Sequence, residues 1–284
     1  MTTLRGSDFL RERFEAHRSC SGCPSPERVA RWFDGLLTLL FPDLASRSFE
    51  SLAELEVEAE RLEGELAGVV ARIPEPIEAR DAMVPAFFRT LPSIVAHLEE
   101  DVSATFEGDP AAVSRSEVVR SYPGFHAIAA YRVAHALHRL GLPIVPRMIT
   151  ELAHGRTGID IHPAALIGRY FCIDHGTGVV IGETAEIGDR VKLYQGVTLG
   201  AMSVRKGDAR TKRHPTIESD VVVYAGATIL GGATRIGQGS TIGGNVWLTR
   251  SVPANTTLHY QERLLDAGVG ETATPLKPRG AACD

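Results

Sequence analysis

Between Ile159 and Val252, branched apolar residues recur at every sixth position, and small residues surround many of them. The recurrence has four runs separated by small shifts of phase: Ile161, Ile167, Ile173 and Val179; Ile181, Ile187, Leu193 and Leu199; Ile217, Val223 and Ile229; Ile236, Ile242 and Leu248. A period of six matches neither an amphipathic helix nor a hairpin strand. It predicts a parallel β-helix built from hexapeptide repeats.

Each coil of such a solenoid has three flat faces, and one apolar residue per face points inward. A single coil cannot bury its own apolar residues, so the coils must stack into one continuous core. The alternative is a Gly-rich β-sandwich in which the spacing arises by chance. The number of apolar residues that stay in phase disfavours that alternative.

Composition agrees with a narrow core, because only 6% of the 284 residues are aromatic. The net charge of −5 gives no reason to expect binding to nucleic acid or to a membrane surface. No apolar run has the length of a membrane span, and the first residues contain no apolar signal core. These features favour a cytoplasmic location.

Four cysteines are too few for a disulfide framework in a chain of this length. Cys20 and Cys23 have the CxxC spacing of some metal and redox sites. Without a second such pair or a βαβ context, the spacing is weak, and we interpret these residues as free thiols.

The chain before the repeats is predicted to be α-helical. We expect a polar lead-in over residues 1–24, a helical domain over 25–155, a β-helix over 156–257 and a C-terminal tail over 258–284. Exposed apolar faces on the helices and flat sides on the solenoid both suggest packing between copies. A homotrimer and a dimer of trimers remain open alternatives.

Helix starts can be located in this region. Ser25-Pro26 places an N-cap before a proline at the first helical position, and Ser51 with Glu54 forms a capping box. A further helical block is expected from Arg115 to Leu140 with a turn at 122–124, and a short helix from about Pro146 to Ala153. Pro74, Pro76, Pro85 and Pro92 are expected to divide the intervening stretch into short pieces, with a helix beginning at Ser93.

Two interruptions of the repeat both carry histidine and aspartate. The first contains Asp174 and His175, and the second is the insertion 201–213 that leads to Arg213 and His214. Insertions into a solenoid leave the stack as loops, which often form a binding face. Neutral imidazole accepts a proton near pH 7, so both histidines are candidate bases. Asp160, one coil before His175, is a candidate to orient its ring.

The chain from about Gly108 to Pro253 resembles the serine O-acetyltransferases, whereas the preceding hundred residues match them only in being helical. The motifs that carry the resemblance are 109–111 (DPA), 122–132 (YPGFHAIAAYR), 160–165 (DIHPAA), 174–175 (DH), 182–185 (GETA), 196–200 (GVTLG) and 213–215 (RHP). The resemblance implies an N-terminal helical domain followed by a left-handed parallel β-helix. It also implies acetyl-CoA as donor, L-serine as acceptor and O-acetylserine, a precursor in cysteine biosynthesis, as product.

The resemblance assigns roles to individual residues. His175 matches the general base, Asp160 its partner, and His214 a second residue that contacts the substrate. Asp109 and Asp174 match carboxylates that hold the ammonium group of serine, and Arg213 matches the cation that binds its carboxylate. These roles fit the chemistry, because a zwitterion needs both signs of charge and its hydroxyl needs a base. The donor of hydrogen bonds to the oxyanion is not identified.

For the donor, the resemblance implies that the CoA arm lies along the solenoid between neighbouring subunits. Gly200, Ala201 and Ala225 match positions of that kind, although small residues also serve coil turns. Ala201 departs from the glycine that many members have, and a basic insertion follows it. Arg205 and Lys206, with Arg210 and Lys212, are candidates to bind the CoA phosphates. No metal is expected.

The C-terminus lacks the isoleucine by which family members bind O-acetylserine sulfhydrylase, so we expect no such complex through this tail. Three other functions remain open. An acetyltransferase acting on another hydroxyl would keep the fold, but Asp109 and Arg213 favour an amino acid. A zinc site of the γ-carbonic anhydrase type could use His162, His175 and His214, yet it leaves Asp174 unexplained. A catalytically inactive scaffold does not explain the complete set of histidines and aspartates.

Overall fold

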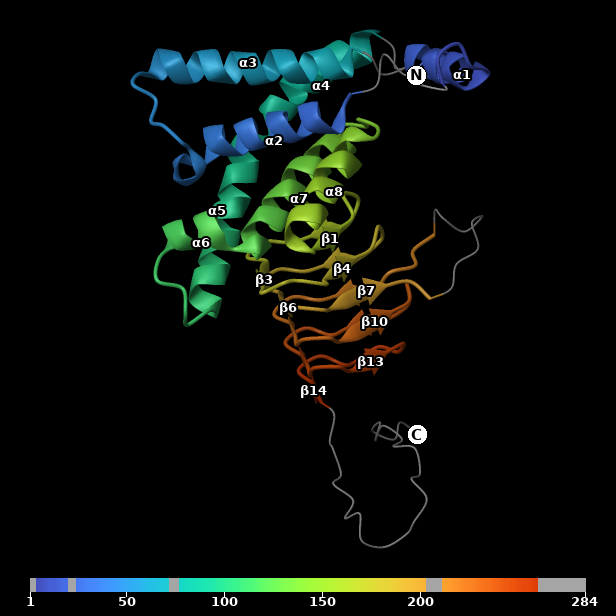
Figure 1. Cartoon of the computed structure of the whole chain (residues 1–284). Helices are drawn as coiled ribbons and strands as arrows, with labels where there is room; N and C mark the ends of the chain where they lie inside the picture. The colour runs from blue at the N-terminus through green and yellow to red at the C-terminus, as the bar shows by residue number, and fades with distance from the viewer. Residues whose placement is uncertain (1–3, 20–23, 72–76, 203–210, 260–284) are drawn as a thin grey trace, which may run out of the picture.

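The computed structural model describes residues 4–19, 24–71, 77–202 and 211–259, and has two parts (Figure 1). The described N-terminal residues form eight α-helices and one short 3₁₀ helix. Their bounds are α1 (Asp8–Ser19), α2 (Pro26–Leu40), η1 (Pro42–Leu44), α3 (Leu52–Val70), α4 (Ile77–Phe88), α5 (Leu91–Gly108), α6 (Arg115–Ser121), α7 (Pro123–Arg139) and α8 (Val145–Thr157). A parallel β-solenoid follows, so the predicted fold class is confirmed.

The helix starts follow the predicted capping chemistry. Ser25 accepts a hydrogen bond from the backbone N–H of Arg28, with Pro26 as the first residue of α2. Ser51 accepts one from the N–H of Glu54 at 3.2 Å, which satisfies a donor that the first turn of α3 leaves unpaired. The turn predicted at 122–124 is limited to Tyr122, because Pro123 already begins α7.

Three helices differ from the sequence-based expectation. Helix α1 lies inside the predicted lead-in, although none of its residues is buried. Helix α4 continues through Pro85 because Phe87, which is fully buried and lies 5.8 Å from the ring of Trp32, fixes it against α2. Helix α5 begins at Leu91 rather than Ser93, since Pro92 fits the first turn, and it extends to Gly108.

The solenoid consists of three parallel sheets, one for each face. Sheet A has the strand order β1-β4-β7-β10-β13, sheet B has β11-β8-β5-β2, and sheet C has β14-β12-β9-β6-β3. The strands are β1 (Asp160–Ile161), β2 (Leu166–Ile167), β3 (Cys172–Asp174), β4 (Val180–Ile181), β5 (Glu186–Ile187), β6 (Lys192–Tyr194), β7 (Thr198–Gly200), β8 (Thr216–Ile217), β9 (Val222–Val223), β10 (Thr228–Leu230), β11 (Arg235–Ile236), β12 (Thr241–Ile242), β13 (Trp247–Leu248) and β14 (Thr257–Leu258).

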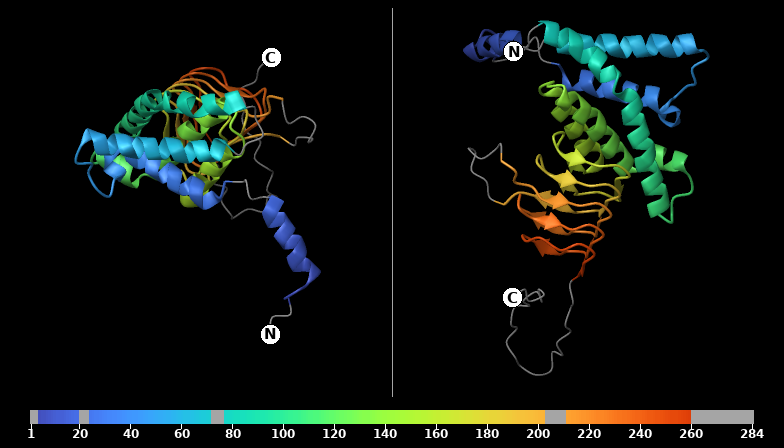
Figure 2. Two further views of the ribbon diagram at one scale, coloured as in Figure 1. Left: turned by 90° about the horizontal axis from the view of Figure 1, so that it is seen from above. Right: turned by 180° about the vertical axis from the view of Figure 1, so that it is seen from behind.

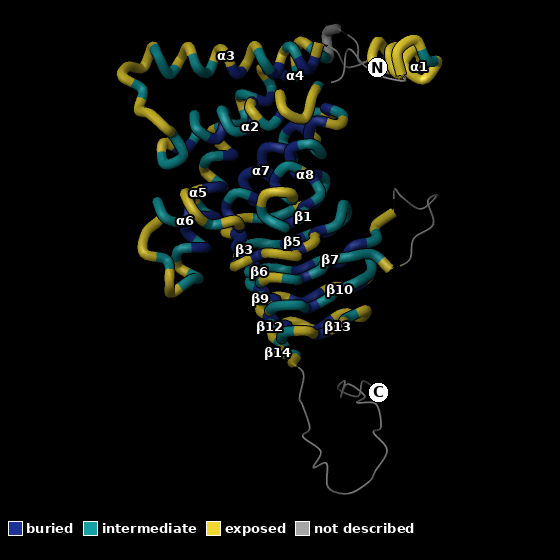
Figure 3. Tube along the Cα trace, in the orientation of Figure 1, coloured by how far each residue is buried: buried dark blue, intermediate teal, exposed yellow. Residues whose placement is uncertain are grey.

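The register places the repeating apolar residues above one another. In sheet A, Ile161 pairs with Ile181, which pairs with Leu199, which pairs with Ile229. These four side chains are at most 2% exposed, and the buried residues form a continuous column inside the coils (Figure 3). The six-residue period therefore predicted correctly which residues of these strands point into the core.

A buried ion pair joins the helices to the first coil. Arg132 in α7 makes a two-pronged contact with Asp101 in α5, with Nη2 2.8 Å from Oδ1. The same nitrogen donates to the carbonyl of Gly168, and the N–H of Phe171 donates to Asp101. The Asp101 and Arg132 side chains are 1% and 8% exposed, so the two opposite charges satisfy each other away from water.

Most of the helices gather at one end of the solenoid, whereas α5 and α6 reach down beside its first coils and leave the later coils uncovered (Figure 2). Helix α1 projects away from the rest (Figure 2). None of the helices in the described part of the chain combines the length and apolar character that crossing a bilayer requires.

Candidate active site

The first interruption of the repeat turns His175 outward from the solenoid. His175 follows β3 with a φ of 58°, and Gly176 and Gly178 also have positive φ. A Cβ on Gly176 would lie 2.5 Å from Ile159, so only glycine fits there. The imidazole is 73% exposed, with Nδ1 3.8 Å from a carboxylate oxygen of Asp174. The left-handed turn thus presents the imidazole of the predicted base to solvent.

Asp109 reaches the same corner from the end of α5. Its carboxylate accepts hydrogen bonds from the Tyr122 hydroxyl at 2.6 Å and from the N–H of Ala111 at 2.9 Å. These two bonds, together with the charges of Lys192 and His175, lower the pKa of Asp109. The same contact raises the pKa of Tyr122 to about 12. Asp109 is therefore ionised at neutral pH, and it is only half-buried.

Lys192 completes this group, which we call the His175 cluster: Asp109, Tyr122, Asp174, His175 and Lys192. The Lys192 ammonium lies 2.8 Å from Asp174 and 2.8 Å from the carbonyl oxygen of Gly108. It also lies 4.5 Å from the centre of the Tyr194 ring. Burial opposes the lysine charge, but the contacts with Asp174 and Tyr194 outweigh it and raise the pKa of Lys192.

A second group, the His214 cluster, consists of Glu183, Thr184, Arg213 and His214. The Arg213 guanidinium forms an ion pair with Glu183. The Thr184 hydroxyl accepts the backbone N–H groups of Arg213 at 2.9 Å and His214 at 3.0 Å. Gly182 makes room for the imidazole, because a Cβ there would lie 2.1 Å from Nε2 of His214. The end of the insertion is thus fixed to the coil above it.

His214 is held as a neutral ring. Its Nδ1 accepts the N–H of Thr184 at 3.0 Å, so the proton of the neutral form is on Nε2. Burial, reinforced by the neighbouring Arg213, lowers the pKa of His214 to about 4. His214 therefore suits the role of a hydrogen-bond donor better than that of a base.

The two clusters occupy different corners of the same solenoid. His175 lies where sheet C leads into sheet A, whereas His214 packs on Gly182, where sheet A leads into sheet B. Within the described residues, no hydrogen bond or ion pair connects the two clusters. One copy of the chain thus separates the predicted base from the predicted carboxylate-binding arginine. It also separates His175 from His162 and His214, so one copy does not assemble these three histidines into a zinc site.

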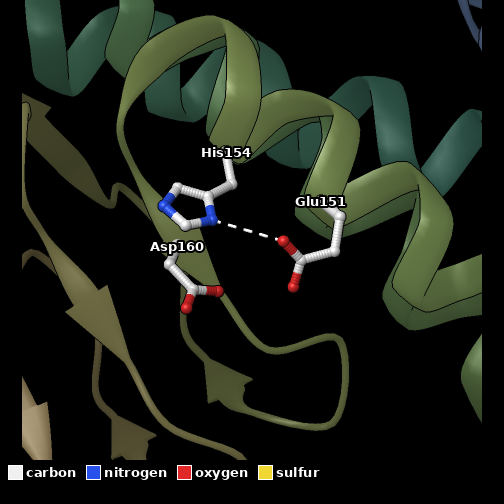
Figure 4. A group of neighbouring side chains, drawn as sticks. All are labelled: Glu151, His154 and Asp160. Atoms are coloured by element: carbon white, nitrogen blue, oxygen red, sulfur yellow. Dashed lines mark hydrogen bonds and ion pairs between the residues drawn. The ribbon is translucent and has the colours of Figure 1, made fainter.

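Asp160 belongs to a third group at the start of the solenoid (Figure 4). Its carboxylate lies 3.9 Å from Arg147, and its oxygen lies within 4.8 Å of ligand atoms of Glu151 and His154. His154 Nδ1 is 3.3 Å from Glu151. Metals bind such residue types, but here Arg147, which also contacts Glu151, supplies the positive charge. Among the described contacts Asp160 has none with His175, and its role as partner of the base stays a prediction.

The positions expected to contact CoA lie at the same two corners. Gly200 ends β7 near the corner of sheets A and B, and Ala201 follows it; Ala225 follows β9 near the corner of sheets C and A. A Cβ on Gly200 would lie 2.8 Å from the end of the Leu230 side chain, so a larger residue there would have to displace that side chain. Arg205 and Lys206 lie outside the described residues, as do Arg210, the Cys20 and Cys23 pair, and the tail from residue 260.

Sequence reasoning missed Lys192, and it gave no role to Tyr122, Glu183 or Thr184. A signal for Lys192 existed in the register. The pairing of β3 with β6 sets Lys192 beside Cys172 and Tyr194 beside Asp174, on the coil directly below the predicted base. Counting coils rather than motifs would have found it.

Comparisons with known proteins identify close relatives. Residues 57–130 match the family model described as "Serine acetyltransferase, N-terminal". This match corrects the expectation that the first hundred residues resemble the family only in being helical, because it begins at residue 57. A plasmid-encoded serine acetyltransferase of Synechococcus elongatus is 46% identical over 257 residues, covering 82% of this chain and 80% of the relative.

Solved structures agree with these matches. A serine acetyltransferase of Entamoeba histolytica (isoform 3, in complex with cysteine) superposes with a TM-score of 0.76 and 35% identity, covering 84% of each chain. A soybean serine acetyltransferase complexed with serine has a TM-score of 0.58 and 40% identity, covering 64% of this chain and 72% of its own. Both likenesses extend across helices and solenoid.

Proposed function

This chain belongs to the serine acetyltransferase family, and from that premise we propose that it transfers an acetyl group from acetyl-CoA to the hydroxyl of L-serine. The product, O-acetyl-L-serine, is a precursor for cysteine biosynthesis. The observation that carries this proposal is the His175 cluster, in which an exposed imidazole lies beside the carboxylate of Asp174 and shares its corner with Asp109, a carboxylate whose pKa is lowered. A base and an ammonium-binding group are what a hydroxyl amino acid requires.

The proposed reaction is a direct attack without a covalent enzyme intermediate. His175 accepts the hydroxyl proton of serine while the oxygen forms a bond to the thioester carbon. The carbon–sulfur bond then breaks, and the proton passes from His175 to the leaving CoA thiolate. Asp109 and Asp174 hold the ammonium group of serine, and Arg213 binds its carboxylate in the two-pronged geometry that suits a guanidinium.

The acceptor needs parts of both clusters, and one copy keeps them at different corners. We therefore propose that each site forms between two copies, with the His175 corner of one against the His214 corner of the next. His214 would contribute the Nε2–H that its buried ring presents. Contacts of this head-to-tail kind can close into a ring. A threefold ring fits the three-sided solenoid and gives a homotrimer; two trimers joined by their helices remain an alternative.

The donor positions support the same arrangement. Ala225 shares a corner with His175, whereas Gly200 and Ala201 share a corner with His214. A groove between copies would therefore present all of them to one CoA molecule, directly below the acceptor. Gly200 and Ala201 reach the His214 corner because they begin the insertion that ends at Arg213, so the independent support comes from Ala225 at the His175 corner.

The release of CoA from acetyl-CoA tests the function. We expect release with L-serine, and at most a few per cent of that rate with glycerol, a hexose or L-homoserine at equal concentration. The amine and carboxylate of the acceptor both matter, so serinamide should also be poor. Release with another acceptor and none with L-serine would contradict the proposed substrate while keeping the acyl transfer.

A mixing experiment tests the shared site. His175→Ala and Arg213→Ala should each be impaired alone at low serine concentration. If each site takes one residue from each of two copies, random coassembly in equal amounts restores about a quarter of the sites, because neighbouring copies supply both intact corners. The measurement is kcat/KM for serine after coexpression, with a purified double variant as the background. Activity that never exceeds the separate variants would mean that the site lies within one chain.

A further inference from the structure

The His175 cluster contains more charge than the assigned roles use. Asp109 and Asp174 are two carboxylates, yet the acceptor brings a single ammonium group. The two also differ in accessibility, since Asp174 is 8% exposed and Asp109 is only half-buried. A cation on this chain is already in contact with the buried carboxylate, Asp174.

Lys192 is that cation, and each of its contacts is specific. Its ammonium lies 2.8 Å from Oδ2 of Asp174 and donates to the carbonyl of Gly108, the last residue of α5. It lies over the Tyr194 ring, which is stacked on Tyr224 with centroids 5.0 Å apart and planes at 6°. The side chain is 16% exposed and so is held in one place.

We propose that Lys192 is a positioning and specificity-determining residue of the acceptor site: it neutralises Asp174 and holds the Gly108–Asp109 segment on the solenoid, leaving Asp109 as the carboxylate that binds the ammonium group of the acceptor. This inference rests on the proposed function and refines it. The cluster then carries one net negative charge, which matches one ammonium group.

The geometry gives Lys192 two separable effects. The bond to Gly108 connects the helical part with β6 and places the next residue, Asp109, beside Asp174 and His175. The charge compensates Asp174, whose carboxylate would otherwise act uncompensated on the imidazole 3.8 Å away. The charged groups that face this position are Asp109 from the end of α5, Asp174 and His175 from the end of β3, and Lys192 from β6, with Tyr122 hydrogen-bonded to Asp109.

Two substitutions distinguish these effects. Lys192→Met keeps the length and removes the charge, so we expect the KM for L-serine to rise about tenfold or more while the KM for acetyl-CoA stays within twofold. The acidic limb of the kcat/KM profile should move to higher pH, because an uncompensated Asp174 favours the protonated form of the neighbouring imidazole. Lys192→Arg keeps the charge but not the geometry, so it should restore the pH profile and not the serine KM.

A matched control is Arg190→Met, which removes a cation from the same coil at an exposed ion pair with Asp220. It should leave both KM values and the pH profile unchanged. A second readout is selectivity. Serinamide keeps the amine and lacks the carboxylate charge. The ratio of kcat/KM for serinamide to kcat/KM for L-serine should therefore rise in Lys192→Met, since the subsite then carries two negative charges.

The outcomes are separable from those of the proposed function. If the unmodified protein does not use L-serine, the proposed function fails before any variant is compared. If it does, and Lys192→Met keeps both the serine KM and the pH profile, the role of Lys192 is refuted. Should Lys192→Met fail to assemble, Lys192→Arg decides, because an unchanged serine KM in that variant would equally refute the positioning role.

Discussion

Replacing His175 by alanine should lower kcat by about 10²- to 10⁴-fold, the range expected when a general base is removed. The side chain is 73% exposed and sits on a turn with positive φ, so nothing in the core depends on the imidazole. The KM for acetyl-CoA and the state of assembly should therefore stay unchanged. Steady-state kinetics with size-exclusion chromatography measure both.

His138→Ala is the matched control for this substitution. His138 is an exposed histidine in the last turn of α7 and belongs to neither cluster. Its loss should change kcat by less than twofold. A His175→Ala protein that retains more than a tenth of the normal kcat would exclude His175 as the base.

Replacing Arg132 by methionine should cause the largest loss of stability, about 3–5 kcal/mol. The substitution leaves Asp101, which is 1% exposed, without its counter-charge. Burial raises the pKa of Asp101, and in the native protein the Arg132 guanidinium and the Phe171 N–H oppose that shift. Without Arg132 the carboxylate must take up a proton or draw water into the junction, and each costs free energy.

Thermal unfolding at one protein concentration measures this effect, because mass action shifts the midpoint of an oligomer. The control is Arg156→Met, which removes an equally two-pronged ion pair with Asp34, at 2.6 and 2.8 Å, from a half-exposed position. We expect about 1 kcal/mol or less from that surface pair. Equal losses of unfolding free energy in Arg132→Met and Arg156→Met would contradict the view that burial makes the Arg132–Asp101 pair more costly to break.

Adding Asp101→Leu to Arg132→Met should recover part of the lost stability. The double variant no longer buries an uncompensated charge, although the Phe171 N–H and the Gly168 carbonyl each lose a partner. The loss in free energy of unfolding of the double variant is compared with the summed losses of the two single variants. A loss larger than that sum would argue that the pair acts through packing rather than charge.

Local patterns in the sequence were enough to predict the solenoid and several helix starts. The inward positions follow from a strict period, so Ile161, Ile181 and Leu199 could be placed in the core before any coordinates. Capping needs only neighbours in the chain, which is why Ser25 and Ser51 were identified. Pro85 shows the opposite case, since burial of Phe87 overrides the local preference against helix.

Contacts between distant segments were not predictable from these patterns. Asp101 and Arg132 are separated by 31 residues and carry no shared motif. Lys192 and Gly108 are separated by 84 residues, and only the packing of α5 beside the solenoid brings them together. The resemblance singled out His175, Asp174 and Arg213, whose roles stay predictions. It could not reveal that one copy of the chain holds Arg213 at a different corner from His175 and Asp174.

The stacking of coils has a consequence for the size of the donor. Sheet C continues below β3 through four more strands, each about 4.8 Å from the last, which gives a wall about 19 Å long beneath His175. Every coil repeats the same corner, so the number of coils determines the length of ligand that the wall can support. Deleting one complete coil would shorten that length by about 4.8 Å and leave the reacting end untouched. A scaffold of this kind can therefore accommodate acyl carriers of different length by a change in the number of coils alone.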